Sequence, residues 1–220
     1  MSEDKKRSSP SCVKCAQAVC LFGIREGTPA FCPTVNKEAE VSEARSILAD
    51  TEILDAAREA SRVEGAGYCR WTRVQEVMEF ARRLDITRIG IAFCVGLRKE
   101  ARLLADVLEA NGFEVVSVCC KVGGEPKEDL GLEDAEKVMP GVYEAYCNPI
   151  AQALILDSEG CGLNVLVGLC VGHDALFIKH AKALTTVLVA KDRVTGHNPA
   201  AALYTSNSYY NRLKNPESEG

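Results

Sequence analysis

Four short apolar runs alternate with amphipathic helical segments between residues 88 and 205 of this 220-residue chain. Each run is apolar at consecutive positions and is bounded by charged residues or glycine, which is typical of strands buried on both faces of a parallel sheet. The expected strands are residues 88–93, 113–118, 163–169 and 185–190. Right-handed crossovers then predict a doubly wound α/β fold, with a mainly parallel sheet of four to five strands in a flavodoxin-like or Rossmann-like 2-1-3-4 order.

Helices are expected between and before these strands. The apolar spacing predicts them over residues 38–62, 74–84, 97–110 and 174–182. Two Asn-Pro pairs, at 148–149 and 198–199, predict further helix starts, with Asn as the N-cap and Pro in the first turn. The predicted organisation is a disordered tail (1–10), a cysteine-rich knuckle (11–37), an α/β domain with an N-terminal helical segment (38–213) and a polar tail (214–220).

The composition places the chain among soluble globular proteins, with 47% hydrophobic and 26% charged residues. The net charge of -5 argues against nucleic-acid partners and a polybasic membrane anchor. The polar N-terminus lacks the apolar core of a signal peptide, and no run approaches the ~20 apolar residues of a membrane span. A cytoplasmic protein is expected, and the sequence leaves its oligomeric state open.

Eleven cysteines are unusual for such a protein, because cytosolic disulfides are rare and thiolates prefer iron–sulfur clusters, zinc or copper(I). Four form an early group, Cys12-x2-Cys15-x4-Cys20-x11-Cys32, followed by Pro33. The spacing and the trailing proline resemble ferredoxin cluster motifs and predict a [4Fe–4S] cluster. A four-cysteine zinc site is the main alternative, and unligated thiols are the other.

A second cysteine group is dispersed in sequence but follows the expected strands. Cys94, the Cys119-Cys120 pair and Cys170 follow strands one, two and three, and Cys147 precedes a helix start. Parallel strands end at one sheet edge, where open α/β folds bind ligands. Cys94, Cys120, Cys147 and Cys170 are therefore predicted to hold a second metal centre, with Cys119 in reserve. The alternative is that cysteine serves as a small hydrophobe at strand ends, the role expected of Cys69 and Cys161.

Polar residues at the same edge are candidates for catalysis and cofactor binding. His173 begins a helix after the run from Gly168 to Gly172, where backbone N–H groups could bind an anionic cofactor group. His173 and His197 are candidate proton donors, and a hydrogen-bonded turn histidine is the alternative for His197. The charged side chains of Lys191, Asp192 and Arg193 are either solvated, or Lys191 or Arg193 contacts an anionic ligand.

Three runs carry a resemblance to a known family. They are Gly168-Leu-Cys-Val-Gly-His-Asp174, Ala92-Phe-Cys-Val-Gly96 and Cys147-Asn-Pro-Ile-Ala-Gln152, alongside the early cysteines and the segments 191–194 and 196–199. Over about residues 11–205 the chain resembles the prokaryotic domain of unknown function 1847, a family of metal-binding proteins from archaea and anaerobic bacteria. The resemblance implies metal binding and supplies no reaction. The early knuckle also looks like the cluster-binding knuckles of anaerobic one-carbon enzymes.

Together these features favour an iron–sulfur protein of anaerobic metabolism. Its N-terminal [4Fe–4S] cluster would relay electrons to the second centre, which would bind or reduce a small substrate as an oxidoreductase does. The alternatives are a non-enzymatic electron or metal carrier serving a redox partner protein, and a zinc protein that binds a small molecule. A ligand-sized pocket beside Cys94 and Cys170 would separate the enzyme from the carrier.

Overall fold

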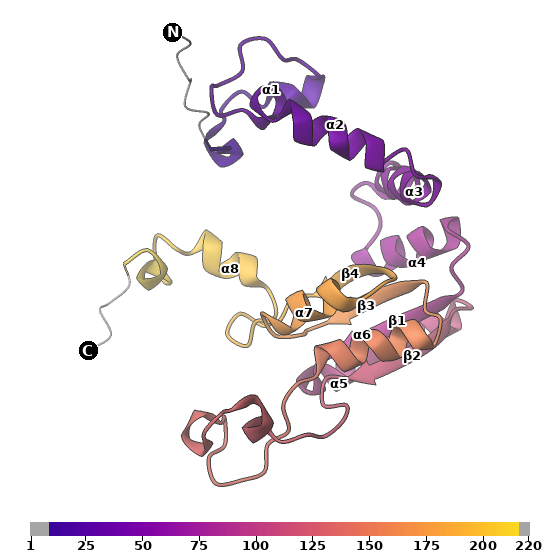
Figure 1. Ribbon diagram of the computed structural model, residues 1–220, viewed down its shortest axis with the longest axis vertical. Helices are drawn as coiled ribbons and strands as arrows, with labels where there is room; N and C mark the ends of the chain where they lie inside the picture. Colours follow the sequence, from indigo (N-terminus) through magenta and orange to yellow (C-terminus); the bar gives the residue numbers. More distant parts are fainter. Residues whose placement is uncertain (1–8, 216–220) are drawn as a thin grey trace. The chain divides into compact units, whose positions relative to one another are not determined.

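The computed structural model describes residues 9–215. The chain divides into two compact units, Met1–Ala66 and Gly67–Gly220 (indigo to purple, and purple to yellow, in Figure 1). The predicted tails fall mostly outside the described residues, and the predicted domain limits stay a prediction. No helix among the described residues is both long and apolar enough to cross a membrane.

The first unit contains three helices among its described residues. They are α1 (Pro33–Asn36), α2 (Glu38–Ile47) and α3 (Thr51–Gly67), preceded by the 3-10 turns Cys12–Lys14 and Val19–Phe22. The single helix predicted over 38–62 is wrong, because the chain breaks between α2 and α3. Asp50 starts the new helix there: its Oδ1 accepts the N–H groups of Glu52 and Ile53, as an N-cap does.

The second unit is built on a four-stranded parallel sheet. Its strands are β1 (Arg88–Phe93), β2 (Glu114–Cys119), β3 (Leu163–Val167) and β4 (Leu184–Val189), in the order β2-β1-β3-β4. The predicted class and strand order are confirmed. The third strand ends two residues earlier than predicted, because Gly168 turns into the left-handed region at φ +64°.

Among the described residues of the second unit, the helices that lie against the sheet are α4 (Arg73–Arg83), α5 (Arg98–Ala110), α6 (Pro149–Ser158) and α7 (His173–His180), whereas α8 (Pro199–Tyr204) extends away from it (Figure 1). The β1–β2 crossover runs in the opposite direction to the next two, so right-handed crossovers put α5 on one face and α6 with α7 on the other. The predicted start of α6 is confirmed, since Asn148 Oδ1 accepts the Ala151 N–H at 2.9 Å. Further 3-10 turns are Val95–Leu97, Lys127–Leu130, Asp134–Glu136 and Asn211–Leu213.

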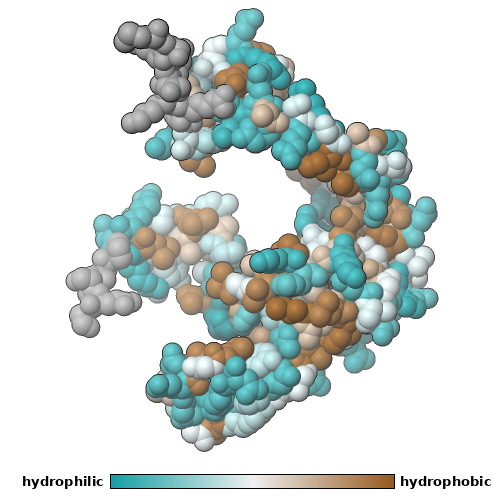
Figure 2. All heavy atoms as spheres, viewed as in Figure 1, coloured by the Kyte–Doolittle hydropathy of each residue, from teal (hydrophilic) through white to brown (hydrophobic). Residues whose placement is uncertain are grey.

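The core lies between the two central strands and the helices on both faces. Ile89, Ile91, Val165 and Phe177 are fully buried there. Some apolar side chains remain outside, and Figure 2 shows brown surface over α6 and α7, where the partly exposed apolar residues are Ile150, Leu154, Leu176 and Ile178. The burial of β1 and β3 explains why their runs are continuously apolar.

Gly90 in β1 leaves room for Asn164 of β3 and for Leu156 of α6. A Cβ added at this position would lie 2.5 Å from Asn164 Oδ1 and 2.9 Å from Leu156 Cδ1. We therefore expect Gly90→Ala to lower the free energy of unfolding by about 1–3 kcal/mol. Chemical denaturation measures this, with Ser117→Ala at an exposed sheet position as the control. Equal midpoints for the two variants would contradict the packing described here.

Candidate functional site

The carboxyl ends of β1 and β2 bring two cysteines into a fixed position. The Cys94 N–H donates to Val167 O at 3.1 Å and the Cys120 N–H donates to Phe93 O at 2.8 Å, so both residues extend the sheet's hydrogen bonding. Cys94 is 7% exposed and Cys120 is 1% exposed. Of the adjacent pair, Cys120 turns toward Cys94, while Cys119 is the last residue of β2 and packs beside the core.

A third cysteine joins them from the start of α6. The Asn148 N–H donates to Cys120 O at 2.8 Å, which anchors the segment before the helix. Cys147 Sγ then lies 3.7 Å from Cys120 Sγ, and Cys120 is also hydrogen-bonded to Cys94. We call Cys94, Cys120 and Cys147 the thiol triad. The predicted approach of Cys147 to this edge is borne out by these contacts.

The triad favours the thiolate form at its two ends. The hydrogen bond to Cys120 is the largest cause at Cys94, and the Gly96 N–H and Lys191 add to it against the effect of burial, so the pKa of the Cys94 thiol falls to about 4. The same kind of bond, with the nearby charges of Lys121 and His173, lowers the pKa of Cys147 to about 6. Hydrogen bonds to Cys147 and Cys94, together with burial, raise the pKa of Cys120.

The raised pKa of Cys120 favours the protonated form of the central thiol. Cys120 carries a single S–H and can donate it to only one neighbour at a time. The Val95 N–H also donates to Cys120 Sγ, at 3.3 Å. The outer sulfurs, Cys94 and Cys147, are consequently the nucleophilic or metal-binding members of the triad, since the thiolate is the reactive form.

Cations from the loop after β4 lie against the thiols. Lys191 Nζ is 3.1 Å from Cys94 Sγ, and Arg193 Nη2 is 3.1 Å from Cys170 Sγ. A Cβ at Gly96 would lie 3.2 Å from Lys191 Nζ, so glycine leaves room for this ammonium group. Positive charge at these distances stabilises thiolates or a bound anionic group.

The thiols open onto a cavity of about 440 Å³. Cys94 and Cys170, which follow the strands on either side of the switch point, both line it, as expected for an open α/β sheet. Cys147 and His173 line it as well, whereas the buried Cys120 lies behind them. The rest of the lining consists of Val95, Gly96, Lys121, Lys127, Leu130, Leu132, Val138, Glu144, Tyr146, Lys191 and Arg193.

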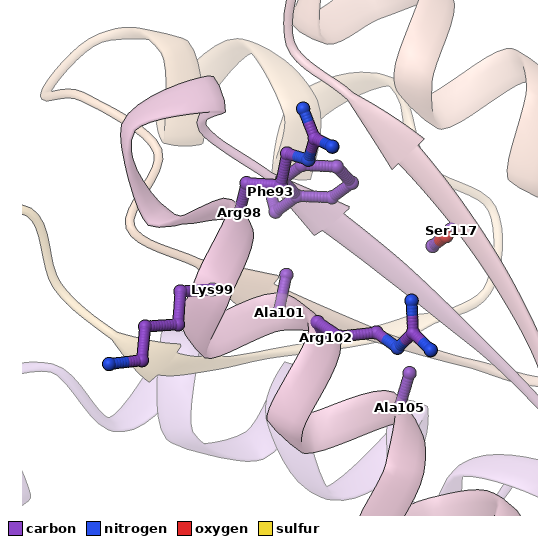
Figure 3. A pocket seen from close by; sticks show the side chains of 7 residues that line it. All are labelled: Phe93, Arg98, Lys99, Ala101, Arg102, Ala105 and Ser117. Atoms are coloured by element: carbon purple, nitrogen blue, oxygen red, sulfur yellow. The ribbon is translucent and has the colours of Figure 1, made fainter.

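A separate hollow of about 570 Å³ lies beside α5 (Figure 3). Its lining residues are Phe93, Arg98, Lys99, Ala101, Arg102, Ala105 and Ser117. None of them is a cysteine, histidine or carboxylate, and Arg102 already pairs with Asp106 at 3.0 Å. These side chains therefore include no thiol or imidazole that would bind a soft metal.

The two predicted proton donors have different surroundings. His173 is half-buried at the start of α7. Its backbone N–H donates to Cys170 O at 2.9 Å, and its side chain lines the cavity. The imidazole Nδ1 of His197 accepts the backbone N–H of Asp192 at 3.1 Å, and the backbone N–H of His197 donates to the carbonyl oxygen of Asp192. His197 thus closes the loop that carries Lys191 and Arg193. The proton-donor role of either histidine stays a prediction.

The predicted cofactor-binding glycines meet backbone and packing demands. Both have positive φ, +64° at Gly168 and +87° at Gly172. A Cβ at Gly168 would lie 2.4 Å from Leu97 Cδ2, so glycine is also required for packing. Neither glycine lines the cavity, and their binding role stays a prediction.

The early cysteines lie in the first unit. Cys12 and Cys20 are exposed and Cys15 and Cys32 are half-buried. A hydrogen bond with the Thr34 side chain lowers the pKa of Cys32, which precedes α1. Over residues 9–215, no three His, Cys, Asp or Glu side chains are placed to hold a single metal ion, at this knuckle or at the sheet edge. The metal-ligand assignments stay predictions.

Residues 121–146 contribute a wall of the cavity, and sequence reasoning named no site residue in this segment. This segment is fastened by Lys127 to Glu144 at 2.6 Å and by Lys137 to Glu128 and Asp134. The available signal was the density of lysine and glutamate in a long loop, which could have suggested an ordered excursion. The pairing of Lys191 and Arg193 with thiols had no signal beyond their position after a strand.

The fold and the site define a parallel α/β protein with a thiol-lined, cation-rich cavity at the carboxyl edge of its sheet. The chain belongs to the family described as "Protein of unknown function (DUF1847)", whose model matches residues 32–188. The match begins at Cys32, so the other three early cysteines precede it. The uncharacterized protein MJ0455 of Methanocaldococcus jannaschii is 47% identical over 159 residues, covering 72% of this chain and 79% of that protein.

Two solved structures show a partial likeness. Dph2 from Pyrococcus horikoshii matches with a TM-score of 0.36 and 18% identity over 65% of this chain. Dph2 from the same organism with a 4Fe-4S cluster matches with a TM-score of 0.34 and 17% identity over 66% of this chain. This chain spans about a third of the Dph2 chains it matches. A likeness this partial carries no conclusion about function.

The triad chemistry predicts an unusual pH profile of alkylation in reduced, metal-free protein. Because the pKa of Cys94 is lowered, its thiolate persists as the pH falls to about 6, where an ordinary thiol is protonated. Burial raises the pKa of Cys161, which is 5% exposed and so matches Cys94 in access. Iodoacetamide labelling followed by peptide mass spectrometry measures both sites.

We expect Cys94 to retain most of its rate between about pH 9 and pH 6, while Cys161 loses nearly all of its rate. Lys191→Met removes a cation beside Cys94 and should move its profile to higher pH. Coincident profiles for Cys94 and Cys161 would refute the assignment of a stabilised thiolate.

Proposed function

We propose that the carboxyl-edge cavity holds an iron–sulfur cluster bound by Cys94, Cys147 and Cys170, at which a small substrate is bound or reduced. The observation that carries this proposal is the meeting of three cavity-lining thiols with two cations in direct contact with their sulfurs. Soft thiolates select iron–sulfur centres, zinc or copper(I) over hard cations.

The donor set fits a cluster better than a single ion. In a cubane cluster each thiolate binds a different iron atom, so the ligand sulfurs need not converge on one point. Three protein ligands leave one iron open to the cavity, and such an iron would supply Lewis-acid or electron-transfer chemistry to a substrate.

The surrounding residues supply the remaining roles. Lys191 and Arg193, which lie 3.1 Å from the sulfurs of Cys94 and Cys170, would offset part of the negative charge of the cluster's ligands. Cys120 keeps its proton and positions Cys94 and Cys147, as outer-shell hydrogen bonds do at metal sites. His173, at the cavity beside Cys147, is the candidate proton donor. The earlier expectation of Cys120 as a fourth ligand remains an alternative that mutagenesis decides.

The early group Cys12, Cys15, Cys20 and Cys32 is proposed to hold a second, [4Fe–4S] cluster that relays electrons. Its support is the ligand spacing and the lowered pKa of Cys32. An oxygen-sensitive oxidoreductase acting in the cytoplasm of an anaerobe follows from the two proposals together, with a redox protein as its electron partner.

A zinc protein is the second candidate, and one distance favours it. Two thiolates of a tetrahedral zinc site are about 3.8 Å apart, given Zn–S bonds of ~2.3 Å. The Cys120–Cys147 separation is 3.7 Å. The carrier alternative has less support, because a cavity of about 440 Å³ beside Cys94 and Cys170 is of the size that small-molecule sites have.

Metal analysis of the anaerobically purified full chain separates these candidates. We expect about eight iron and eight sulfide atoms per chain, with visible absorption that bleaches on reduction. About four iron atoms would leave a single cluster and end the relay proposal. A colourless protein containing zinc and no iron would refute the iron–sulfur proposal at both sites.

Single substitutions then assign the ligands. Cys94→Ser, Cys147→Ser and Cys170→Ser should each lower iron by about half, because a cluster with two protein ligands is poorly held. Cys69→Ser, at an exposed cysteine outside the site, is the matched control and should retain all iron. Cys120→Ser should also retain iron, and its loss of about half would make Cys120 a ligand instead.

A further inference from the structure

The cavity beside the thiol triad combines two kinds of surface. The strand ends and the loop after β4 contribute the thiols with Lys191, Arg193 and His173. The 121–146 segment contributes Leu130, Leu132 and Val138, and two of these are open to solvent. Leu130 is 61% and Val138 is 81% exposed, so apolar surface is left that a ligand body could cover.

The charge around the cavity is unbalanced toward the positive. Four cations line it, Lys121, Lys127, Lys191 and Arg193, while Glu144 is the one carboxylate among the described lining residues and is paired with Lys127 at 2.6 Å. The other three cations lie near thiols. When those sulfurs bind a [4Fe–4S] cluster, the positive core leaves the cluster and its three thiolates with about one net negative charge, which the three cations exceed.

Arg193 has the geometry to hold a planar anion. Its Nη2 bonds Cys170 Sγ, and a guanidinium has five N–H donors in a fork that matches a carboxylate or phosphate. Its side chain is exposed and lies on the loop that His197 closes through Asp192. The fork is therefore presented on an ordered loop beside the thiols.

We propose that this cavity binds a small organic anion, with a carboxylate or phosphate head held by Arg193 and Lys191 and an apolar body against Leu130, Leu132 and Val138. This inference rests on the proposed function, since it names the substrate class of the same site. A neutral ligand would leave the cations uncompensated, and an inorganic anion would leave the apolar wall uncovered.

Calorimetric titration of the full-length, anaerobically purified, metal-loaded protein tests the inference with three probes. Hexanoate carries both the carboxylate and the apolar alkyl chain. Acetate carries the carboxylate with a single methyl group, and hexanamide carries the alkyl chain with an uncharged amide. We expect hexanoate to bind at least about tenfold more tightly than either of the others, since charged hydrogen bonds and covered methylenes each contribute on that scale. Hexyl phosphate against hexanoate then ranks the two head groups.

Variants locate the binding. Arg193→Gln should weaken hexanoate binding by about tenfold or more, and Lys191→Met should also weaken it. Arg98→Gln, in the separate hollow of Figure 3, is the matched control and should leave the affinity unchanged. Hexanamide binding as tightly as hexanoate, or Arg193→Gln behaving like Arg98→Gln, would overturn the inference.

The metal content of the same samples separates the two proposals. Full metal loading with no hexanoate binding refutes the organic-anion inference and leaves the metal site standing. Hexanoate binding that depends on Arg193 in a chain with neither iron nor zinc refutes the metal site and retains the anion cavity.

Discussion

The parallel pairing of β1 with β2 on one side and β3 on the other is the constraint on which the site depends. Because β1 is central, the crossover to β2 runs one way and the later crossovers run the other way. The connections after β1 and β3 therefore diverge at the carboxyl edge and leave a crevice between them. Cys94 and Cys170 follow these two strands, and no local feature of either segment could place them at the same cavity.

Backbone hydrogen bonds position the cysteines at the sheet edge without the help of a metal. Hydrogen bonds from Cys94, Cys120 and Asn148 continue the sheet past its last residues, which fixes three sulfur-bearing segments together. Hydrogen bonding among these thiols lowers the pKa of Cys94 and Cys147 and raises the pKa of Cys120. The cost of gathering thiolates is offset by Lys191 and Arg193, whose charges lie within 3.1 Å of sulfur.

Two loops that line the cavity are held in place by their own hydrogen bonds and ion pairs. The loop after β4 is closed by His197 and Asp192, which together hold the lysine and arginine on either side of Asp192. The segment between β2 and α6 is held by lysine–carboxylate pairs and supplies the apolar part of the cavity. Thiols, cations and apolar side chains from separate segments therefore line one cavity.

The fold class, the strand order and the edge at which the later cysteines gather could be predicted from the amino-acid sequence. The continuously apolar strands are a local signal, and the structure contains them because the central strands are buried on both faces. The Asn148-Pro149 helix start is also a local signal, because the Asn148 side chain caps its own helix. The one helix predicted over 38–62 failed because the Asp50 cap is a short-range signal hidden within a longer apolar period.

The amino-acid sequence could not predict which of Cys119 and Cys120 turns toward Cys94, or which cation contacts which sulfur. Adjacent residues of a strand point to opposite faces, so the choice depends on where the strand ends and how the backbone turns there. Lys191 meets Cys94 across 97 residues of sequence, a contact set by the order of strands in space. Contacts between residues so far apart in sequence produce no periodic pattern of residue types, because such patterns reflect local secondary structure.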